Sequence, residues 1–316
     1  MKNRVLVTGA SGFLGRFVFE NLSADGHEII AAGRCRPAAS FGATWLECDL
    51  LKEPQRRSLM RTVRPTHMVH LAWYAEHGLF WEAAENKKWL EATADLARLF
   101  GEFGGRRFVG AGSCAEYDWT ELKGPCLERQ TPLRPATLYG RCKDQARAAV
   151  ASAAKKSGFS QAWARIFHLY GPFEPPRRFV PSIITALLEG REARMSHGEQ
   201  IRDMLHVADV GAAFAAVLKS DIEGPVNLGS GHGRPLKETA RIIAQRLGRM
   251  DLLRLGALPA APNDPPLLVP DISQLNRTGF LPRFDLETGL DQAINWWRDN
   301  RRSPAANRQG GPTLLL

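Results

Sequence analysis

A tyrosine and a lysine lie four positions apart, at Tyr139 and Lys143, within a stretch that has the pattern of an amphipathic helix. Residues with this spacing share one face of an α-helix, so the two side chains are expected to be neighbours. A free tyrosine phenol has a pKa of about 10, and a nearby ammonium lowers that pKa by roughly 1–3 units because it favours the phenolate. Such a phenol can exchange a proton with a hydroxyl or carbonyl group near neutral pH. The pair therefore predicts general acid–base chemistry.

A glycine-rich loop comes near the start of the chain, where Thr8-Gly-Ala-Ser-Gly-Phe-Leu-Gly15 follows a short apolar run and opens a helix. Glycines at these spacings permit a tight turn, close approach of the backbone to a pyrophosphate and close helix–strand packing. The N-terminus of the helix then favours the anion. The sequence predicts a dinucleotide site here, with contacts from Gly9, Ser11, Gly12, Phe13, Leu14 and Gly15.

The end of the second predicted strand selects between the two nicotinamide dinucleotides. An acidic residue there binds the adenosine ribose of NAD, whereas an arginine pairs with the additional phosphate of NADP. This chain has Gly33-Arg34-Cys35-Arg36 and no acid at that point. The sequence therefore favours NADP, bound through Arg34. The alternatives are that Arg34 is a solvated loop charge and that the cofactor is NAD.

Short apolar runs alternate with amphipathic stretches through the first half of the chain. Strands are expected at 4–8, 28–32, 44–48, 67–71, 107–111 and 162–169, and helices near 13–25, 53–64, 80–103 and 136–157. This alternation is typical of an α/β fold with a doubly wound parallel sheet of the Rossmann type. Prolines after Tyr170 end the alternation, the stretch 257–270 has the composition of a loop, and a last helix is expected near 285–299.

The predicted organisation has a dinucleotide-binding domain and a smaller C-terminal substrate-binding lobe. The domain takes in residues 1–172 and about 207–231. The lobe takes in 173–206 and about 232–300, and 301–316 are expected to form a disordered tail.

Composition excludes several classes of protein. Hydrophobic residues make up 44% and charged residues 24% of the chain, as in globular proteins. No stretch resembles a membrane span or a signal peptide, so we expect a cytoplasmic protein. The five cysteines are scattered without a CxxC pair, which predicts neither a disulfide framework nor a metal site. The net charge of +9 fits either a solvated basic surface or attraction of a phosphorylated small molecule. The arginines are dispersed along the chain, which argues against a nucleic-acid-binding protein.

Several separated motifs together resemble the extended short-chain dehydrogenase/reductase superfamily, in its NAD-dependent epimerase/dehydratase branch. The resemblance extends over about residues 3–300. The matching segments are Thr8–Gly15, Asp49-Leu50, His70–Trp73, Tyr139–Lys143, Leu169–Pro172, Arg202–Asp209 and Asn227–Gly231.

The resemblance implies a nucleotide-diphosphate sugar as substrate and a role for each matching residue. Ser113, Tyr139 and Lys143 would be catalytic, and Asp49, Leu50, Leu71 and Ala72 would line the cofactor together with Tyr139 and Lys143. Trp73, His77, Ser113, Cys114, His168, Arg178 and Arg202 are the candidates for binding substrate. The family is usually homodimeric through helices near 85–103 and 136–157, so a homodimer is expected, with no nucleic-acid or membrane partner.

Some of these substrate-side residues have a second interpretation. The stretch from Trp73 to Trp81 departs from the small residues usual in the family, and either packs aromatic rings or forms a wall of the sugar pocket. His168 stands where relatives have asparagine, and either donates a hydrogen bond near the sugar phosphates or packs in the core. Arg178 either binds the diphosphate or is solvated, whereas Arg202 lies within a family segment.

The stretch after Ser113 separates the reactions of the family. In 4,6-dehydratases an Asp and a Glu act there as acid and base, but Cys114 and Ala115 hold those places here, which disfavours elimination. An NADPH-dependent reductase of a 4-keto (6-deoxy)hexose nucleotide sugar is the favoured function. A nucleotide-sugar 4-epimerase is the alternative, and a non-catalytic protein that senses NADP is disfavoured because Ser113, Tyr139 and Lys143 are all present.

Overall fold

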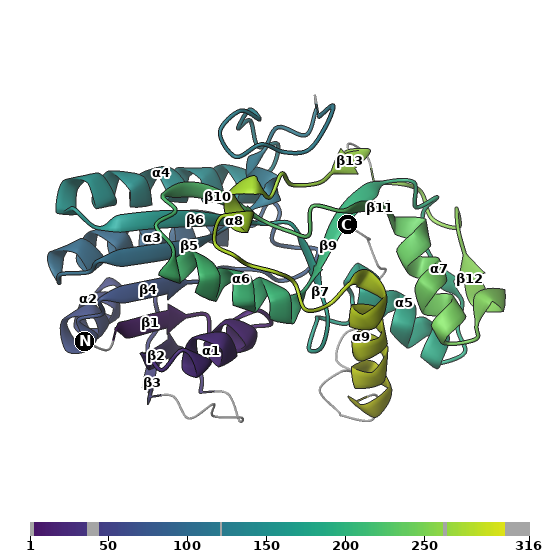
Figure 1. Ribbon diagram of the computed structural model, residues 1–316, viewed down its shortest axis with the longest axis horizontal. Coiled ribbons are helices and arrows are strands. Elements are labelled where there is room, and N and C mark those ends of the chain that lie inside the picture. Colours follow the sequence, from purple (N-terminus) through teal and green to yellow (C-terminus); the bar gives the residue numbers. More distant parts are fainter. Residues whose placement is uncertain (1–2, 37–43, 121, 262–263, 301–316) are drawn as a thin grey trace.

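The computed structural model describes residues 3–36, 44–120, 122–261 and 264–300. The predicted tail at 301–316 lies outside these residues. In Figure 1 a large sheet with its helices occupies one end of the molecule, and a smaller group of helices and short strands occupies the other.

The larger of the two parts is built on a parallel sheet of seven strands. Its strands follow the order β10 (Gly224–Leu228), β6 (Ser160–Ile166), β5 (Arg107–Ser113), β4 (His67–His70), β1 (Arg4–Thr8), β2 (Glu28–Gly33) and β3 (Thr44–Glu47). From β1 the chain adds β2 and β3 on one side, and it then adds β4, β5, β6 and β10 on the other side. Doubly wound sheets bind their ligands at such a change of direction, here between β1 and β4. The predicted Rossmann-type fold is confirmed.

Helices cover both faces of this sheet, because its strands are apolar on both sides. The helices α1 (Gly15–Ala24) and α6 (Val207–Lys219) cover one face, and Val5 and Val7 of β1 pack against them. Leu6 between them belongs to the opposite core. That core is formed with α2 (Glu53–Val63), α3 (Glu85–Glu102) and α4 (Leu138–Ser157). The alternation follows from the two-residue period of a strand.

The smaller lobe has its own hydrophobic core, formed between α5 (Phe179–Leu188), α7 (Leu236–Arg246) and α9 (Leu286–Asn300). Its main strand is β9 (Ile201–His206), which pairs with β7 (His168–Tyr170), β11 (Gly233–Pro235) and β13 (Leu267–Leu268). The remaining short elements are η1 (Cys114–Glu116), β8 (Ala193–Arg194), η2 (Met250–Leu252), β12 (Leu253–Arg254) and α8 (Ser273–Asn276).

Two predicted elements differ from the structure. The single strand expected at 162–169 is divided, because the chain leaves the large sheet after Ile166 and β7 pairs with β9 instead. An apolar run shows that a strand is buried but not which sheet it joins. The helix expected from residue 80 begins only at Glu85, since residues 77–82 form turns.

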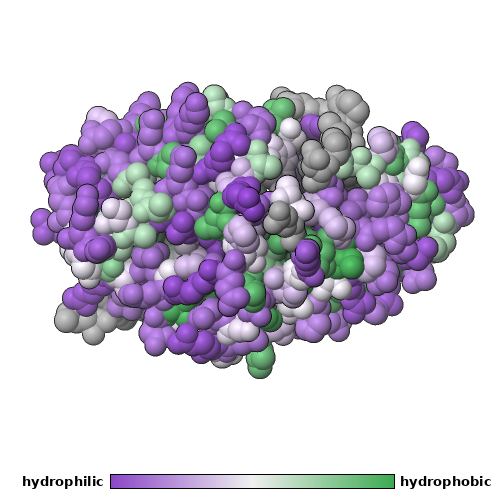
Figure 2. Space-filling model, turned by 90° about the horizontal axis from the view of Figure 1, so that it is seen from above, coloured by the Kyte–Doolittle hydropathy of each residue, from purple (hydrophilic) through white to green (hydrophobic). Residues whose placement is uncertain are grey.

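The face of the molecule seen in Figure 2 is mainly hydrophilic, with hydrophobic side chains in small scattered groups. All five cysteines are free thiols, and only Cys35 is exposed. In the described part of the chain, no helix has the length and apolar character needed to span a membrane.

Candidate active site

The glycine-rich loop joins β1 to α1 and lies against the end of β4. Gly9 has a φ of 73°, and a Cβ there would lie 2.7 Å from the backbone nitrogen of Ala72. A Cβ on Gly15 would lie 2.1 Å from the carbonyl oxygen of Gly9. No side chain caps the N-terminus of α1 at Leu14. The tight turn and the uncapped helix therefore fit a pyrophosphate group.

Five other predicted cofactor residues follow the ends of the neighbouring strands β2, β3 and β4. Arg34 is exposed directly after β2, next to Gly33, where a Cβ would lie 4.0 Å from the Ser11 hydroxyl. Asp49 accepts a hydrogen bond from the backbone of Leu51 at 3.1 Å and so also has a local turn role. Leu50 is buried in the core. Leu71 and Ala72 follow β4 and are partly exposed, as are Phe13 and Leu14, whereas Ser11 and Gly12 are exposed.

Tyr139, Lys143 and Ser113 lie together because the start of α4 packs tightly against η1. A Cβ on Gly140 would lie 2.2 Å from the carbonyl oxygen of Ala115, so the helix approaches as closely as glycine permits. The Lys143 ammonium donates a hydrogen bond to the carbonyl oxygen of Ala111 at 2.8 Å. The Ser113 hydroxyl lies beside the Tyr139 phenol and favours its ionised form.

Burial controls the protonation of this group before any ligand binds. Burial raises the pKa of Tyr139 above its usual range, and the Ser113 hydroxyl opposes that shift. Burial also lowers the pKa of Lys143 to about 7, while the carboxylate of Glu116 raises it. Nζ of Lys143 lies 3.9 Å from the centre of the Trp73 ring, a distance at which an aromatic face attracts an ammonium.

Three aromatic residues of the loop before α3 surround the Tyr139 ring. Phe80, Trp81 and Trp73 contact it edge to face, with centroid distances of 4.8, 5.8 and 6.4 Å. The Trp73 indole donates to the side chain of Asn86 at 2.8 Å, and buried Asn86 donates to the carbonyl of Phe80 at 2.6 Å. The unusual aromatic stretch therefore packs around the tyrosine. Asn86, which holds this loop in place, was not among the residues predicted from the sequence.

The candidate substrate residues form a second group next to Tyr139. Arg178 and Arg202 both act on the pKa of His168, and burial lowers that pKa to about 3. Arg202 also favours the thiolate of buried Cys114, and Arg178 favours the phenolate of Tyr139. Each of the four candidates therefore interacts electrostatically with another member of the group, and Cys114 and Arg178 also act on Tyr139. His77 lies in the loop between β4 and α3.

Both arginines of this group are already paired with carboxylates, which the sequence did not reveal. Arg178 pairs with Glu174 at 3.2 Å, and Arg202 pairs with Asp264. Their partners lie 4 and 62 positions away, and helical spacing predicts neither pair, because Glu174 and Arg178 lie in the non-helical segment between β7 and α5. A diphosphate would have to share or take over these guanidinium groups.

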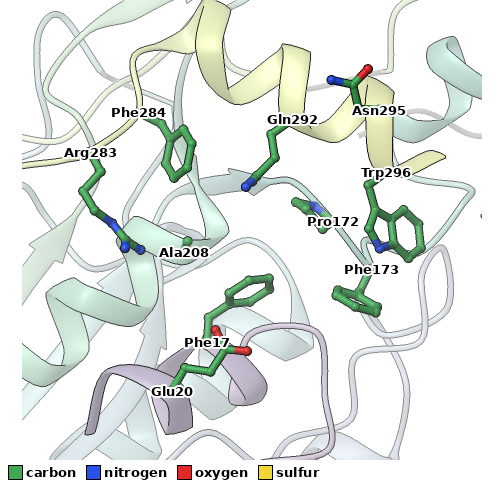
Figure 3. A pocket seen from close by; sticks show the side chains of 10 residues that line it. All are labelled: Phe17, Glu20, Pro172, Phe173, Ala208, Arg283, Phe284, Gln292, Asn295 and Trp296. Carbon is green, nitrogen blue, oxygen red and sulfur yellow. The ribbon is translucent and has the colours of Figure 1, made fainter. Parts of the chain in front are cut away.

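A pocket of about 450 Å³ lies between α1, the loop after β7 and α9 (Figure 3). The rings of Phe17, Phe173, Phe284 and Trp296 line much of it. Phe173 contacts Trp296 at 4.8 Å between ring centroids and lies under the guanidinium of Arg16 at 3.7 Å. These contacts join the large domain to the small lobe.

The fold and the site define a dinucleotide-dependent enzyme of the extended short-chain dehydrogenase/reductase type. More particularly, the chain belongs to the NAD dependent epimerase/dehydratase family, which matches residues 5–229.

Similar proteins span nearly the whole chain. UDP-glucuronic acid decarboxylase 1 of Xenopus tropicalis is 26% identical, over 97% of this chain and 75% of that protein. A dTDP-4-dehydro-6-deoxy-D-allose reductase of Streptomyces bikiniensis is 25% identical, over 94% of this chain and 97% of its own. The crystal structure of Thermotoga maritima UDP-glucose 4-epimerase with UDP-glucose has a TM-score of 0.87 at 21% identity, covering 95% of this chain and 100% of that one. This last likeness shows the shared fold.

Proposed function

We propose that this protein is an NADPH-dependent reductase of a 4-keto (6-deoxy)hexose carried on a nucleoside diphosphate. The observation that carries the proposal is that Glu116, the one carboxylate within the turn that follows Ser113, is buried and ion-paired. Glu116 is fully buried and forms an ion pair with Arg165 at 2.7 Å, so it cannot act as the acid or base of an elimination. What remains beside Tyr139 is chemistry that reduces or oxidises a carbon–oxygen bond. The similarity to a dTDP-4-dehydro-6-deoxy-D-allose reductase supports this direction.

Each catalytic residue has a defined task in this proposal. When bound, the dinucleotide supplies a hydride. Tyr139 donates its proton to the C4 oxygen of the sugar, and Ser113 hydrogen-bonds the same oxygen. The Ser113 oxygen accepts the backbone N–H of Ala115 at 3.2 Å, which leaves its own hydrogen to donate. Lys143 would bind the nicotinamide ribose, and its ammonium would favour the phenolate.

The binding residues follow from their positions. The uncapped N-terminus of α1 would hold the pyrophosphate of the cofactor, and Arg34 would pair with the adenosine 2′-phosphate. Arg178 and Arg202 would bind the substrate diphosphate, as guanidinium groups bind phosphates bidentately. His168 and Cys114 lie beside them and would face the sugar phosphates. We also propose the predicted division into a dinucleotide-binding domain and a substrate-binding lobe, with the substrate bound between the two. We propose further that the protein is a homodimer.

The test uses the purified full chain with a panel of nucleotide 4-keto-6-deoxyhexoses and either NADPH or NADH. A reductase consumes one reduced cofactor for each sugar converted, and NMR of the product identifies the new C4 configuration. Interconversion of two sugars without net consumption of cofactor would instead identify a 4-epimerase. A protein that binds NADPH and leaves every sugar of the panel unchanged would contradict the proposal.

A further inference from the structure

A buried carboxylate lies directly behind the predicted catalytic serine. Glu116 is 0% exposed and follows Ser113 by three positions. One of its oxygens accepts the backbone N–H of Ser113 at 2.8 Å and the indole N–H of Trp163 at 2.9 Å. The other accepts Nε of Arg165 at 2.7 Å. Both oxygens are therefore engaged, and one of them holds the backbone of the serine itself.

The strand before Ser113 is built to admit this carboxylate. A Cβ on Gly112 would lie 2.4 Å from the indole nitrogen of Trp163 and 2.7 Å from a carboxylate oxygen of Glu116. A Cβ on Gly110 would lie 2.4 Å from the same indole ring. The indole thus lies against bare backbone, and any side chain at these two positions would displace it.

The ion pair continues into a network that crosses the core. Arg165 is also 0% exposed, and it donates to the hydroxyl of Tyr117 and to the carbonyl of Glu128, each at 3.0 Å. The Tyr117 hydroxyl in turn donates to Asn227 at 2.7 Å. Removing two charges from water costs about as much as a buried pair regains, so such a pair is weak evidence for stability. Its position behind Ser113 points to a different role.

The Lys143 ammonium and the Glu116 carboxylate bind the same short stretch of β5. Nζ of Lys143 donates to the carbonyl oxygen of Ala111 at 2.8 Å, and Glu116 accepts the N–H of Ser113, two residues further along, at 2.8 Å. Burial alone would lower the pKa of Lys143, and the negative charge of Glu116 acts against it. His70, from β4, also faces the lysine but is neutral, since burial and Lys143 hold its pKa at about 3. Tyr139, from the lysine's own helix, is neutral near pH 7, because the ordinary pKa of a phenol is about 10 and burial raises it further.

We infer that Glu116 is a positioning residue, which orients Ser113 through its backbone N–H and places its negative charge beside the Lys143 ammonium. The catalytic meaning of this role rests on the proposed reductase function, but the electrostatic effect on Lys143 does not. Glu116 itself touches neither substrate nor cofactor in this role. It acts entirely through the serine and the lysine.

The test measures the protonation of Lys143 in the full chain without substrate or cofactor. Lysine labelled with ¹³C at Cε is titrated by NMR, and Lys143→Arg identifies the signal by its loss. Glu116→Gln keeps the shape of the side chain and removes its charge, so the midpoint for Lys143 is expected to fall by about one pH unit or more. The matched control, Trp163→Phe, removes one donor to the same carboxylate, keeps the charge and should leave the midpoint in place. Equal midpoints in wild type and Glu116→Gln would overturn the inference.

A second variant separates charge from folding. Glu116→Gln leaves the Arg165 guanidinium buried without a counter-ion, so Glu116→Gln/Arg165→Met is titrated as well, which removes both charges of the pair. The lowered Lys143 midpoint should persist in this variant. A return to the wild-type midpoint would assign Glu116 a structural role only.

The reductase assay then tests the catalytic half of the inference. The decline of kcat at alkaline pH should begin about one pH unit lower in both variants than in wild type, with KM little changed. If the Lys143 midpoint shifts while no sugar is ever reduced, the electrostatic role stands and the proposed function fails. If sugars are reduced with an unshifted pH profile, the positioning role fails.

Discussion

Arg178 and Glu174 form an ion pair in the segment between β7 and α5, with Nε of the arginine 3.2 Å from a carboxylate oxygen. Glu174 is deeply buried, whereas Arg178 is about one-third exposed, so the arginine is the member that a ligand can reach. The backbone N–H of Gly171 donates to Glu174 at 3.3 Å. Burial raises the pKa of Glu174 to about 7, and Arg178 limits that rise.

Substrate binding is therefore expected to take up a proton. If a diphosphate takes over Arg178, Glu174 loses part of its counter-charge and its pKa rises further. Affinity should be highest below about pH 7 and fall as the pH rises above it, by at most about tenfold per pH unit. The measurement is calorimetric binding of a nucleoside diphosphate in two buffers with different protonation enthalpies, which counts the protons directly. Glu174→Gln keeps the Gly171 contact and should abolish the uptake. Equal proton counts in wild type and variant would exclude the coupling.

Tyr139→Phe should preserve the aromatic packing and remove only the proton donor. A positioned acid–base group contributes about 10²–10⁴-fold, so turnover should fall by that factor while the dissociation constant of NADPH stays the same. Tyr74→Phe is the control, because its hydroxyl donates only to Glu76 on an exposed loop, and it should retain wild-type turnover. Wild-type rates in Tyr139→Phe would show that the proposed mechanism is wrong.

Arg34→Asp should change the preferred cofactor. A charged hydrogen bond to the 2′-phosphate would be lost and a carboxylate placed against it, so the ratio of kcat/KM for NADPH over NADH should fall by about 10- to 100-fold. Arg36→Asp changes the same charge at another exposed position two residues further and should have a smaller effect. An unchanged ratio in Arg34→Asp would remove the basis for assigning NADP.

His70 should make the protein sensitive to acid. Its ring nitrogens lie 2.7 Å from the Thr8 hydroxyl and 2.9 Å from that of Thr93, and burial lowers its pKa to about 3. A folded pKa below the unfolded value of about 6.5 means that the unfolded chain binds more protons, so stability falls as pH drops from about 6.5 towards 3.

The slope that His70 contributes is about 1.4 kcal/mol per pH unit in the free energy of unfolding. His70→Gln should reduce the slope by that amount between about pH 6 and pH 4, where the histidine is mostly protonated in the unfolded chain and neutral in the folded one. Urea unfolding at a series of pH values measures it. His232→Gln, at an exposed position, should leave the slope unchanged. An identical slope in His70→Gln and wild type would contradict the assignment of a neutral buried imidazole.

The sequence alone determined the parallel sheet, because a strand that is buried on both faces is apolar throughout and helical spacing is local. The predicted starts of β1 and β2 coincide with the observed ones. The same local logic placed Tyr139 and Lys143 one turn apart, and they do lie in a single helix, α4. The glycine loop was recognisable for the same reason, since a turn between adjacent elements needs no distant partner.

Only the tertiary structure decided which charges meet. Glu116 pairs with Arg165 across 49 positions and Arg202 with Asp264 across 62, and neither pairing has a sequence period. The structure also assigned β7 to the second sheet, because an extended apolar segment can pair with any strand that packing brings to it. Protonation follows the same rule. The pKa of Lys143 depends on how much water the whole fold removes from its surroundings and on which charge remains beside it, and residues brought together from distant parts of the chain set both.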